Sequence, residues 1–230
     1  MKLLILFDID GTILYPGTLA RQLMDEEVTL FTGKSPRLQV EDVAGFTDPI
    51  IIHNALQKIK FTDGRLTKAV DIILQNYFNR LQEEYPRYPK PYLYEDAMKL
   101  VHRCKLEGWQ VGLLSGNMRK AAKVKLSRFK IWDEFALGVF GDEASTREDL
   151  LWLAQEQAWD ELGEAYTYSK MVMVGDTPND ARVAAMNGVR SLIVCRSPEW
   201  REEIEAMKPT WLVNSFEDLD SIIIKIKESL

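Results

Sequence analysis

The sequence has few of the residues that build disulfides or soft-metal sites: 2 of its 230 residues are Cys and 2 are His. Cys104 and Cys195 lie far apart, each in an apolar neighbourhood, and neither belongs to a CxxC pair. A disulfide framework or a sulfur-ligated metal site requires more thiols than this. We expect both cysteines to be small core residues of a protein in a reducing compartment.

Long apolar runs and basic runs are missing as well. The apolar residues 3–7 are followed at once by Asp8 and Asp10, so they are too few for a secretion signal, and no stretch approaches the roughly 18 residues of a membrane-spanning helix. With 29 Lys and Arg against 35 Asp and Glu, the net charge of −6 is poorly suited to an anionic membrane or a nucleic-acid backbone. We expect a cytoplasmic protein without membrane or nucleic-acid partners, present as a monomer or homodimer.

Short apolar runs alternate with helical patterns through most of the chain. Hydrophobic residues make up 46% of the sequence, which is enough for one large domain carrying a smaller one. The runs have strand length and are apolar throughout, as is typical of parallel strands covered on both faces. They occupy residues 3–7, 110–114, 135–140, 170–174 and 192–195. This pattern predicts an α/β fold with a doubly wound parallel sheet.

Several helices between these runs have recognisable ends. Gly108 is placed to end a helix that begins near residue 94. Ser145 and Glu148 have the spacing of a capping box, and Thr177 followed by Pro178 opens another helix. A last helix is predicted over residues 217–230.

Residues 15–94 interrupt the alternation, because they contain helical patterns only. Turn-forming residues bound this stretch, with Tyr-Pro-Gly at 15–17 and prolines at 86, 89 and 91. We predict a core domain formed by residues 1–15 and 95–230. Residues 16–94 are predicted to be an all-helical domain, inserted after the first strand as a lid over the strand ends.

Acidic residues follow two of the predicted strands. Asp8 and Asp10 lie in FDIDGT, residues 7–12, and Asp176 and Asp180 lie in GDTPND, residues 175–180. If the two strands are neighbours, Asp176 lies beside Asp8, and such close carboxylates repel unless a cation or a proton intervenes. Oxygen ligands without sulfur or imidazole suit Mg²⁺. The alternative for Asp10 is an Asp-Gly turn, which is disfavoured because the acids recur at the ends of two strands. For Asp180, a helix-capping role explains the residue equally well.

A third polar group, Ser115-Gly116-Asn117, closes the strand over residues 110–114. A hydroxyl and free backbone N–H groups at a helix start can converge on a phosphate oxygen. Ser and Asn are also common helix-capping residues, and that role alone would explain them.

Taken together, FDIDGT, SGN and GDTPND resemble the motifs of the haloacid dehalogenase (HAD) superfamily of Mg²⁺-dependent phosphotransferases. The resemblance in order and spacing covers roughly residues 1–15 and 95–215. It implies a Rossmann-like core, and the helical insert resembles the C1 cap of this family.

The resemblance also implies residue roles. Asp8 would be the nucleophile that becomes an aspartyl-phosphate, and Asp10 would be the general acid and base. Mg²⁺ would be held by the Asp8 carboxylate, the Asp10 carbonyl and Asp176, with Asp180 behind them. The substrate-binding residues implied are Thr12, Ser115, Gly116, Asn117, Thr47 and Asp48.

Two assignments remain open at this point. The family places a Lys, or less often an Arg, where this chain has Arg147, so Arg147 is our predicted catalytic cation; Lys123, Lys125 and Lys170 are its competitors. The loop AGFTDP, residues 44–49, resembles the substrate-selecting loop of the cap. An ordinary helix start, with Asp48 as the N-cap and Pro49 at the first helical position, would explain the same residues.

The function implied is a Mg²⁺-dependent hydrolase of a small phosphorylated metabolite, similar to phosphoglycolate phosphatase. A sugar phosphomutase of the β-phosphoglucomutase type is the first alternative. A 2-haloacid dehalogenase is less favoured, because its chemistry needs neither Asp10 nor a metal-binding Asp176. A non-catalytic binding protein would have no use for this set of charged groups.

Overall fold

A single sheet of parallel strands forms the centre of the molecule, in a computed structural model that describes residues 2–61 and 64–229. The strand order is β5-β4-β1-β6-β7-β8. The strands are β1 (Leu4–Phe7), β4 (Gln110–Ser115), β5 (Leu137–Phe140), β6 (Met171–Gly175), β7 (Arg190–Val194) and β8 (Trp211–Val213). The predicted α/β fold with a doubly wound parallel sheet is confirmed. β8 was missed, because its residues are only half-buried and too few to show a period.

Helices cover both faces of this sheet, and the alternation of side chains along β1 explains why. Ile5 and Phe7 pack on the face covered by α4 (Glu95–Leu106), α5 (Arg119–Ser127) and α9 (Leu219–Glu228). Leu4 and Leu6 pack on the opposite face, under α6 (Asp149–Leu162) and α7 (Pro178–Met186). Because both faces are buried, all four residues of β1 must be apolar.

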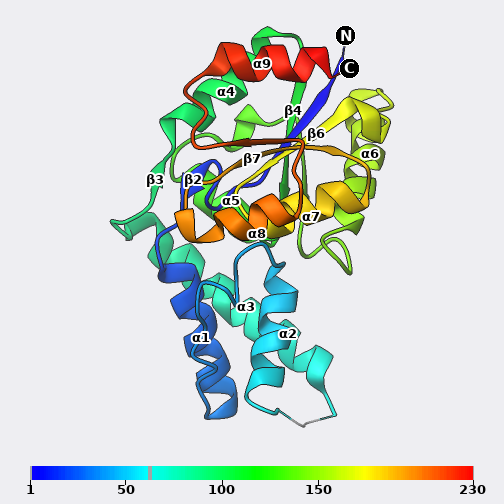
Figure 1. Ribbon diagram of the computed structural model, residues 1–230. Helices are drawn as coiled ribbons and strands as arrows, with labels where there is room; N and C mark the ends of the chain where they lie inside the picture. Colours follow the sequence, from blue (N-terminus) through cyan, green and yellow to red (C-terminus); the bar gives the residue numbers. More distant parts are fainter. Residues whose placement is uncertain (1, 62–63, 230) are drawn as a thin grey trace.

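Three further helices gather at one end of the molecule (Figure 1). They are α1 (Leu19–Thr32), α2 (Asp48–Lys58) and α3 (Leu66–Glu84), and they bury a hydrophobic cluster of their own. That cluster also takes in Met118 and Ala121 near the start of α5, so the helical segment packs directly on the core. Its status as a separate cap domain over residues 16–94 stays a prediction.

The two ends of the helical segment are joined by a small ribbon that the sequence did not predict. β2 (Leu14–Tyr15) pairs in antiparallel fashion with β3 (Tyr92–Leu93), and the rings of Tyr15 and Tyr92 stack with centroids 5.1 Å apart. The expectation of helices only between residues 15 and 94 is therefore wrong at both ends. Strands of two residues are too short to show a period.

A capping prediction is also corrected. α6 begins at Asp149, three residues later than a capping box of Ser145 and Glu148 requires, and Glu148 makes no side-chain cap. The reciprocal bonds instead join Thr146 and Asp149: each backbone N–H donates to the other side chain, at 3.2 and 3.4 Å.

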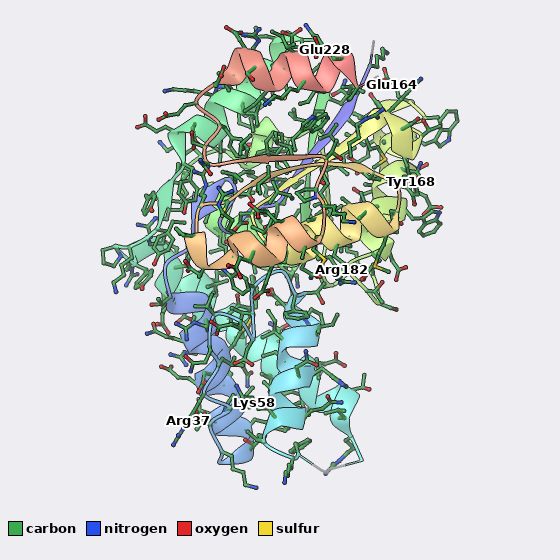
Figure 2. The ribbon with its side chains drawn as sticks, viewed as in Figure 1. Arg37, Lys58, Glu164, Tyr168, Arg182 and Glu228 are labelled. Atoms are coloured by element: carbon green, nitrogen blue, oxygen red, sulfur yellow. The ribbon has the colours of Figure 1, made fainter. Side chains whose placement is uncertain are left out.

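The remaining short elements connect these layers. They are the 3₁₀ turns η1 (Tyr85–Arg87), η2 (Trp132–Glu134), η3 (Tyr168–Lys170) and η4 (Pro198–Trp200), and the helix α8 (Arg201–Ala206). Charged side chains such as Lys58 and Glu228 lie at the outer surface (Figure 2). Cys104 and Cys195 are buried and unpaired, as predicted. Within the described ranges, every helix is too short or too polar to cross a membrane.

Candidate active site

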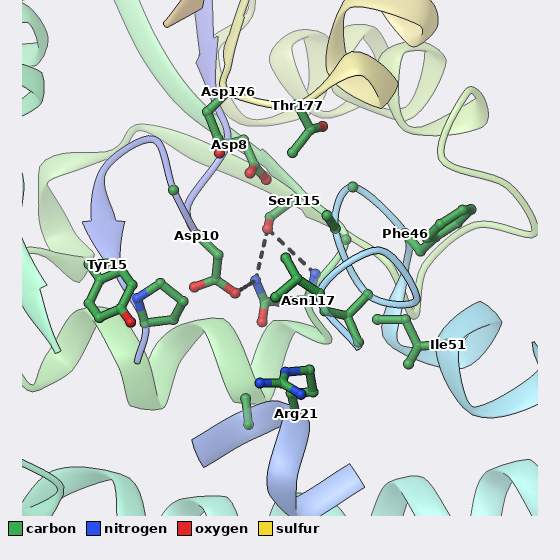
Figure 3. Close-up of a pocket in the computed structure, with 18 of the residues that line it drawn as sticks. Asp8, Asp10, Tyr15, Arg21, Phe46, Ile51, Ser115, Asn117, Asp176 and Thr177 are labelled. Atoms are coloured by element: carbon green, nitrogen blue, oxygen red, sulfur yellow. Dashed lines mark hydrogen bonds between the residues drawn. The ribbon is translucent and has the colours of Figure 1, made fainter. Parts of the chain in front are cut away.

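The candidate site lies where three neighbouring strands end. β1 has β4 on one side and β6 on the other, with Phe7 in register with Leu113 and Val174. The residues that follow these positions therefore meet at one edge of the sheet, as expected for a ligand site in an open α/β fold. Asp8, Ser115 and Asp176 all line the same pocket (Figure 3).

Three carboxylates form a compact cluster there. One oxygen from each of Asp8, Asp176 and Asp180 lies within 4.8 Å of the others. Burial raises the pKa of Asp8 to about 7, with Asp180 and Asp10 adding to this effect and Arg147 opposing it. Burial together with Asp180 and Asp8 also raises the pKa of Asp176 well above its usual value. These acids are therefore arranged to share a proton or a cation, and an all-oxygen donor set fits Mg²⁺.

Asp10 stands apart from this cluster, because its side chain turns toward α5. Its predicted contribution to a metal site was the backbone carbonyl, and that contribution stays a prediction.

The turn formed by residues 10–12 contacts the Asp176 carboxylate and fixes its position. Thr12 is fully buried and donates a hydrogen bond to Oδ1 of Asp176 at 2.9 Å. Gly11 has φ +87°, and a Cβ at this position would overlap the Asp176 carboxylate. Thr12 was predicted to bind substrate, but it does not line the pocket, and its hydroxyl is committed to Asp176.

Asp180 serves in two ways at once. It forms a capping box with Thr177 at the start of α7, so the capping interpretation is correct. Its other oxygen pairs with Arg147, and its side chain is fully buried. Asp180 therefore ties the helix start to the acidic cluster.

Arg147 is the cation that reaches the acids. Its Nη2 lies 3.1 Å from Oδ1 of Asp8 and also pairs with Asp180. Burial disfavours its charged form, but Asp180 and Asp8 outweigh burial and raise the pKa of Arg147. Two competitors are placed elsewhere: Lys123 is exposed, and Lys170 precedes β6 at the opposite end of the sheet.

The third competitor, Lys125, reaches the pocket by another route. It is buried in α5, where it pairs with Asp10 and donates to Oδ1 of Asn117 at 2.6 Å. Asn117 in turn donates to Oδ2 of Asp10 and to Oγ of Ser115, each at 3.0 Å. Sequence reasoning treated Lys125 only as a substitute for Arg147, whereas both cations line the pocket.

The loop over residues 44–49 closes one side of the pocket. The Asp48 N–H donates to the carbonyl of Gly116, and the Asp48 carboxylate accepts from the Met118 N–H, both at 2.8 Å. Thr47, not Asp48, is the N-cap of α2 and accepts from the Ile50 N–H at 3.4 Å, so the predicted helix start was one residue off. Asp48 is thereby free to bond to the start of α5.

Between the loop and the strand ends lies a cavity of about 380 Å³. Several lining residues were not singled out as site residues from the sequence, because they lie outside the three motifs and only the tertiary fold brings them to the pocket. These are Tyr15, Arg21, Met24, Tyr77, Tyr92, Tyr94, Arg196 and Trp200. Figure 3 shows Arg21, on α1, on the side of the pocket away from Asp8 and Asp176. Its guanidinium donates to the Leu38 carbonyl at 2.6 Å, and among the described residues no carboxylate lies within ion-pair distance of it.

The sequence profile of the haloacid dehalogenase-like hydrolases matches residues 3–188. The chain belongs to this family. The resemblance carried by the three motifs is thereby confirmed.

Individual relatives of this HAD-like hydrolase match along nearly their whole length. The pyrophosphatase PpaX of Bacillus cereus (strain AH820) is 24% identical over 233 residues, which cover 98% of each chain. A predicted phosphoglycolate phosphatase from Haemophilus somnus 129pt has a TM-score of 0.70 at 16% identity, covering 96% of this chain and 97% of that one. CbbY from Rhodobacter sphaeroides, solved with xylulose-(1,5)bisphosphate, has a TM-score of 0.74 at 20% identity, covering 95% and 96%. At these identities the structures show a shared fold.

The contact between Gly11 and Asp176 gives a stability prediction for this HAD-like hydrolase. Gly11→Ala adds a Cβ that strains a positive φ and displaces the Asp176 carboxylate. Gly33→Ala is the matched control, because Gly33 has φ +74° and open space around its Cβ position. In urea unfolding we expect Gly33→Ala to cost about 1 kcal/mol and Gly11→Ala at least about 2 kcal/mol more. Equal costs would show that the close approach of Asp176 is unimportant.

Asp48 gives a pH prediction. Burial raises its pKa to about 7; Lys125 and the Met118 N–H oppose the rise, and Asp10 and Asp142 add to it. A carboxyl with a raised folded-state pKa retains its proton on folding, so the wild type loses stability as pH rises from about 4 to about 7. Asp48→Asn lacks this loss.

The stability of Asp48→Asn relative to wild type should therefore increase between pH 5 and pH 8, by up to a few kcal/mol at about 1.4 kcal/mol per pK unit. Urea unfolding of both proteins at the two pH values measures the change. A difference that is the same at both pH values would contradict an elevated pKa at Asp48.

Proposed function

We propose that this HAD-like hydrolase is a Mg²⁺-dependent phosphomonoester hydrolase, which acts on a small phosphorylated metabolite through an aspartyl-phosphate on Asp8. The observation that carries the proposal is the pairing of Asp8 with Arg147 at 3.1 Å at the end of a cavity of about 380 Å³. Arg147 can neutralise both the nucleophile and the incoming phosphoryl oxygens. A cavity of this size suits a small metabolite better than a protein or nucleic acid.

The reaction divides into two displacements. An oxygen of Asp8 attacks phosphorus, the bond from phosphorus to the ester oxygen breaks, and Asp10 gives its proton to the departing alkoxide. Water then attacks the phosphorus of the aspartyl-phosphate and gives a proton to Asp10. The bond from phosphorus to the Asp8 oxygen breaks, which releases inorganic phosphate and restores the Asp8 carboxylate. Ser115 ends β4 and lines the cavity with Gly116, so the Ser115 hydroxyl and the backbone around Gly116 would bind the phosphoryl oxygens.

A metal ion fits the acidic cluster. Asp8 and Asp176, with Asp180 beside them, would hold Mg²⁺, and buried carboxylates this close need a positive charge to be ionised together. When bound, the ion supplies neutralising charge to the phosphoryl oxygens.

A sugar phosphomutase is the second candidate, and Arg21 is the feature that favours it. A guanidinium that has no carboxylate partner within residues 2–61 and 64–229 can bind a second phosphate, as a bisphosphate intermediate would require. The two candidates are separated with a panel of pyrophosphate, phosphoglycolate, nucleoside monophosphates and hexose phosphates in the presence of Mg²⁺. Release of inorganic phosphate supports the hydrolase, and isomerisation of a sugar phosphate supports the mutase.

Asp8→Asn tests the nucleophile. We expect turnover of the best substrate to fall at least about 10³-fold, because the amide cannot form the covalent intermediate. Asp133→Asn is the matched control, since Asp133 is exposed on η2, and it should retain wild-type rates. Phosphate release measures both. A wild-type rate in Asp8→Asn would rule out an aspartyl-phosphate on this residue.

Metal binding is tested without turnover, by thermal unfolding in the presence of Mg²⁺. A ligand at about 100 times its dissociation constant stabilises the folded state by about 2.7 kcal/mol, so Tm of the wild type should rise by several degrees. Asp176→Asn should lose most of the rise, while Asp133→Asn keeps it. If Asp176→Asn shows the same shift as the wild type, Mg²⁺ binds elsewhere.

A further inference from the structure

A buried lysine on α5 has no assigned role in the function proposed above. Lys125 lies on α5, the helix that follows β4, and its charged side chain is only 1% exposed. A buried ammonium is costly unless it is paired and hydrogen-bonded. Its position therefore depends on the groups it contacts inside the pocket.

Those groups are few and specific. Lys125 pairs with Oδ2 of Asp10 and donates to Oδ1 of Asn117 at 2.6 Å. Asp48 is near enough to feel its charge, but within residues 2–61 and 64–229 Asp10 is the only carboxylate in ion-pair contact with Lys125. The ammonium thus serves Asp10 and Asn117 and leaves the Asp8 cluster to Arg147.

The two oxygens of Asp10 are treated differently by this arrangement. Oδ2 accepts from both Lys125 and Asn117, whose amide lies 3.0 Å away. Oδ1 is buried and has no hydrogen-bond partner. Figure 3 shows Asp10 held by Asn117 through one oxygen while the other oxygen remains unbonded. Lys125 and Asn117 therefore fix the orientation of the Asp10 carboxyl through a single oxygen, Oδ2.

We propose that Lys125 is a positioning residue: together with Asn117 it holds the Asp10 carboxyl through Oδ2, in the orientation from which Asp10 exchanges a proton with the leaving group. This inference rests on the proposed function, in which Asp10 is the general acid and base. In the first displacement the proton of the Asp10 carboxyl passes to the ester oxygen as the bond from that oxygen to phosphorus breaks. In the second, a proton from the attacking water returns to the Asp10 carboxylate. Lys125 retains its own protons throughout.

The role is tested by substrates that differ in their need for a proton. The nitrophenolate of an aryl phosphate leaves without a proton from the enzyme, whereas the alkoxide of an alkyl phosphate requires general acid catalysis. General acid catalysis contributes about 10²-fold or more to the rate. The parameter to compare is kcat/KM, because it reports on the steps up to transfer of the phosphoryl group to Asp8. Lys125→Met keeps the length and apolar stem of the side chain but removes its charge.

We expect Lys125→Met to lower kcat/KM for the alkyl phosphate at least about 30-fold more than for the aryl phosphate. Lys123→Met, exposed on the same helix, should change neither. In the Asp10→Asn background, the additional effect of Lys125→Met should disappear, because residues that act as a unit are not additive. Circular dichroism and Tm of each variant establish that it is folded.

Equal losses for the two substrates would overturn the inference, since they would mean that Lys125 binds the phosphoryl group or only supports the fold. An effect that persists in the Asp10→Asn background would overturn it too. Should Lys125→Met fail to fold, Asn117→Ala removes the second donor to Oδ2 and must show the same substrate dependence. If the wild type hydrolyses neither phosphate, the proposed function itself fails. If the wild type is active and Lys125→Met is equally active, only the inference about Lys125 fails.

Discussion

Repulsion between buried carboxylates is the constraint on which the candidate site depends. Asp8, Asp176 and Asp180 have oxygens within 4.8 Å of one another, and two of them are among the most buried polar side chains described. Water cannot screen such charges in the interior, so the protein must supply compensating groups. Arg147 supplies one positive charge to Asp8 and Asp180, and the oxygen donors left over match a hard divalent cation.

The same constraint explains why two different cations pair with Asp8 and Asp10. Asp10 is two residues from Asp8 but turns to the other side, where Lys125 and Asn117 hold it. The two carboxylates of the DxD motif are thus separated into different electrostatic surroundings. A pair of acids in different surroundings can take different chemical roles, one as a nucleophile and one as a proton carrier.

The part of the site that lies on strand ends was predictable from the sequence, and the part that lies on helices was not. Continuous apolar runs locate β1, β4 and β6, and the parallel order brings Asp8, Ser115 and Asp176 to one edge. Lys125 gives no such signal, because a lysine in an amphipathic helix is ordinarily solvent-exposed. Its burial goes with its contacts to Asp10 and Asn117 at the strand ends, which only the tertiary fold brings together.

Local patterns also failed where two of them overlapped. The spacings of Ser145 with Glu148 and of Thr146 with Asp149 are equivalent, and the chain uses the second. Glu148 is engaged elsewhere, since it pairs with Arg182 of α7 at 2.6 Å. The HAD motifs could be located from the sequence because each follows a buried apolar strand. A helix cap could not, because the choice between two equivalent spacings depends on tertiary contacts of the side chains.

The ribbon of β2 and β3 has a consequence for the architecture of the chain. Because the outgoing and returning strands are hydrogen-bonded partners, the segment between them leaves and re-enters the α/β layer at a single point. A change in the length of this segment therefore need not move β1 or α4, which lie on either side of the ribbon. Descendants of such a chain can enlarge, shrink or exchange the segment, and so change what reaches the acids, while the sheet that carries those acids stays as it is.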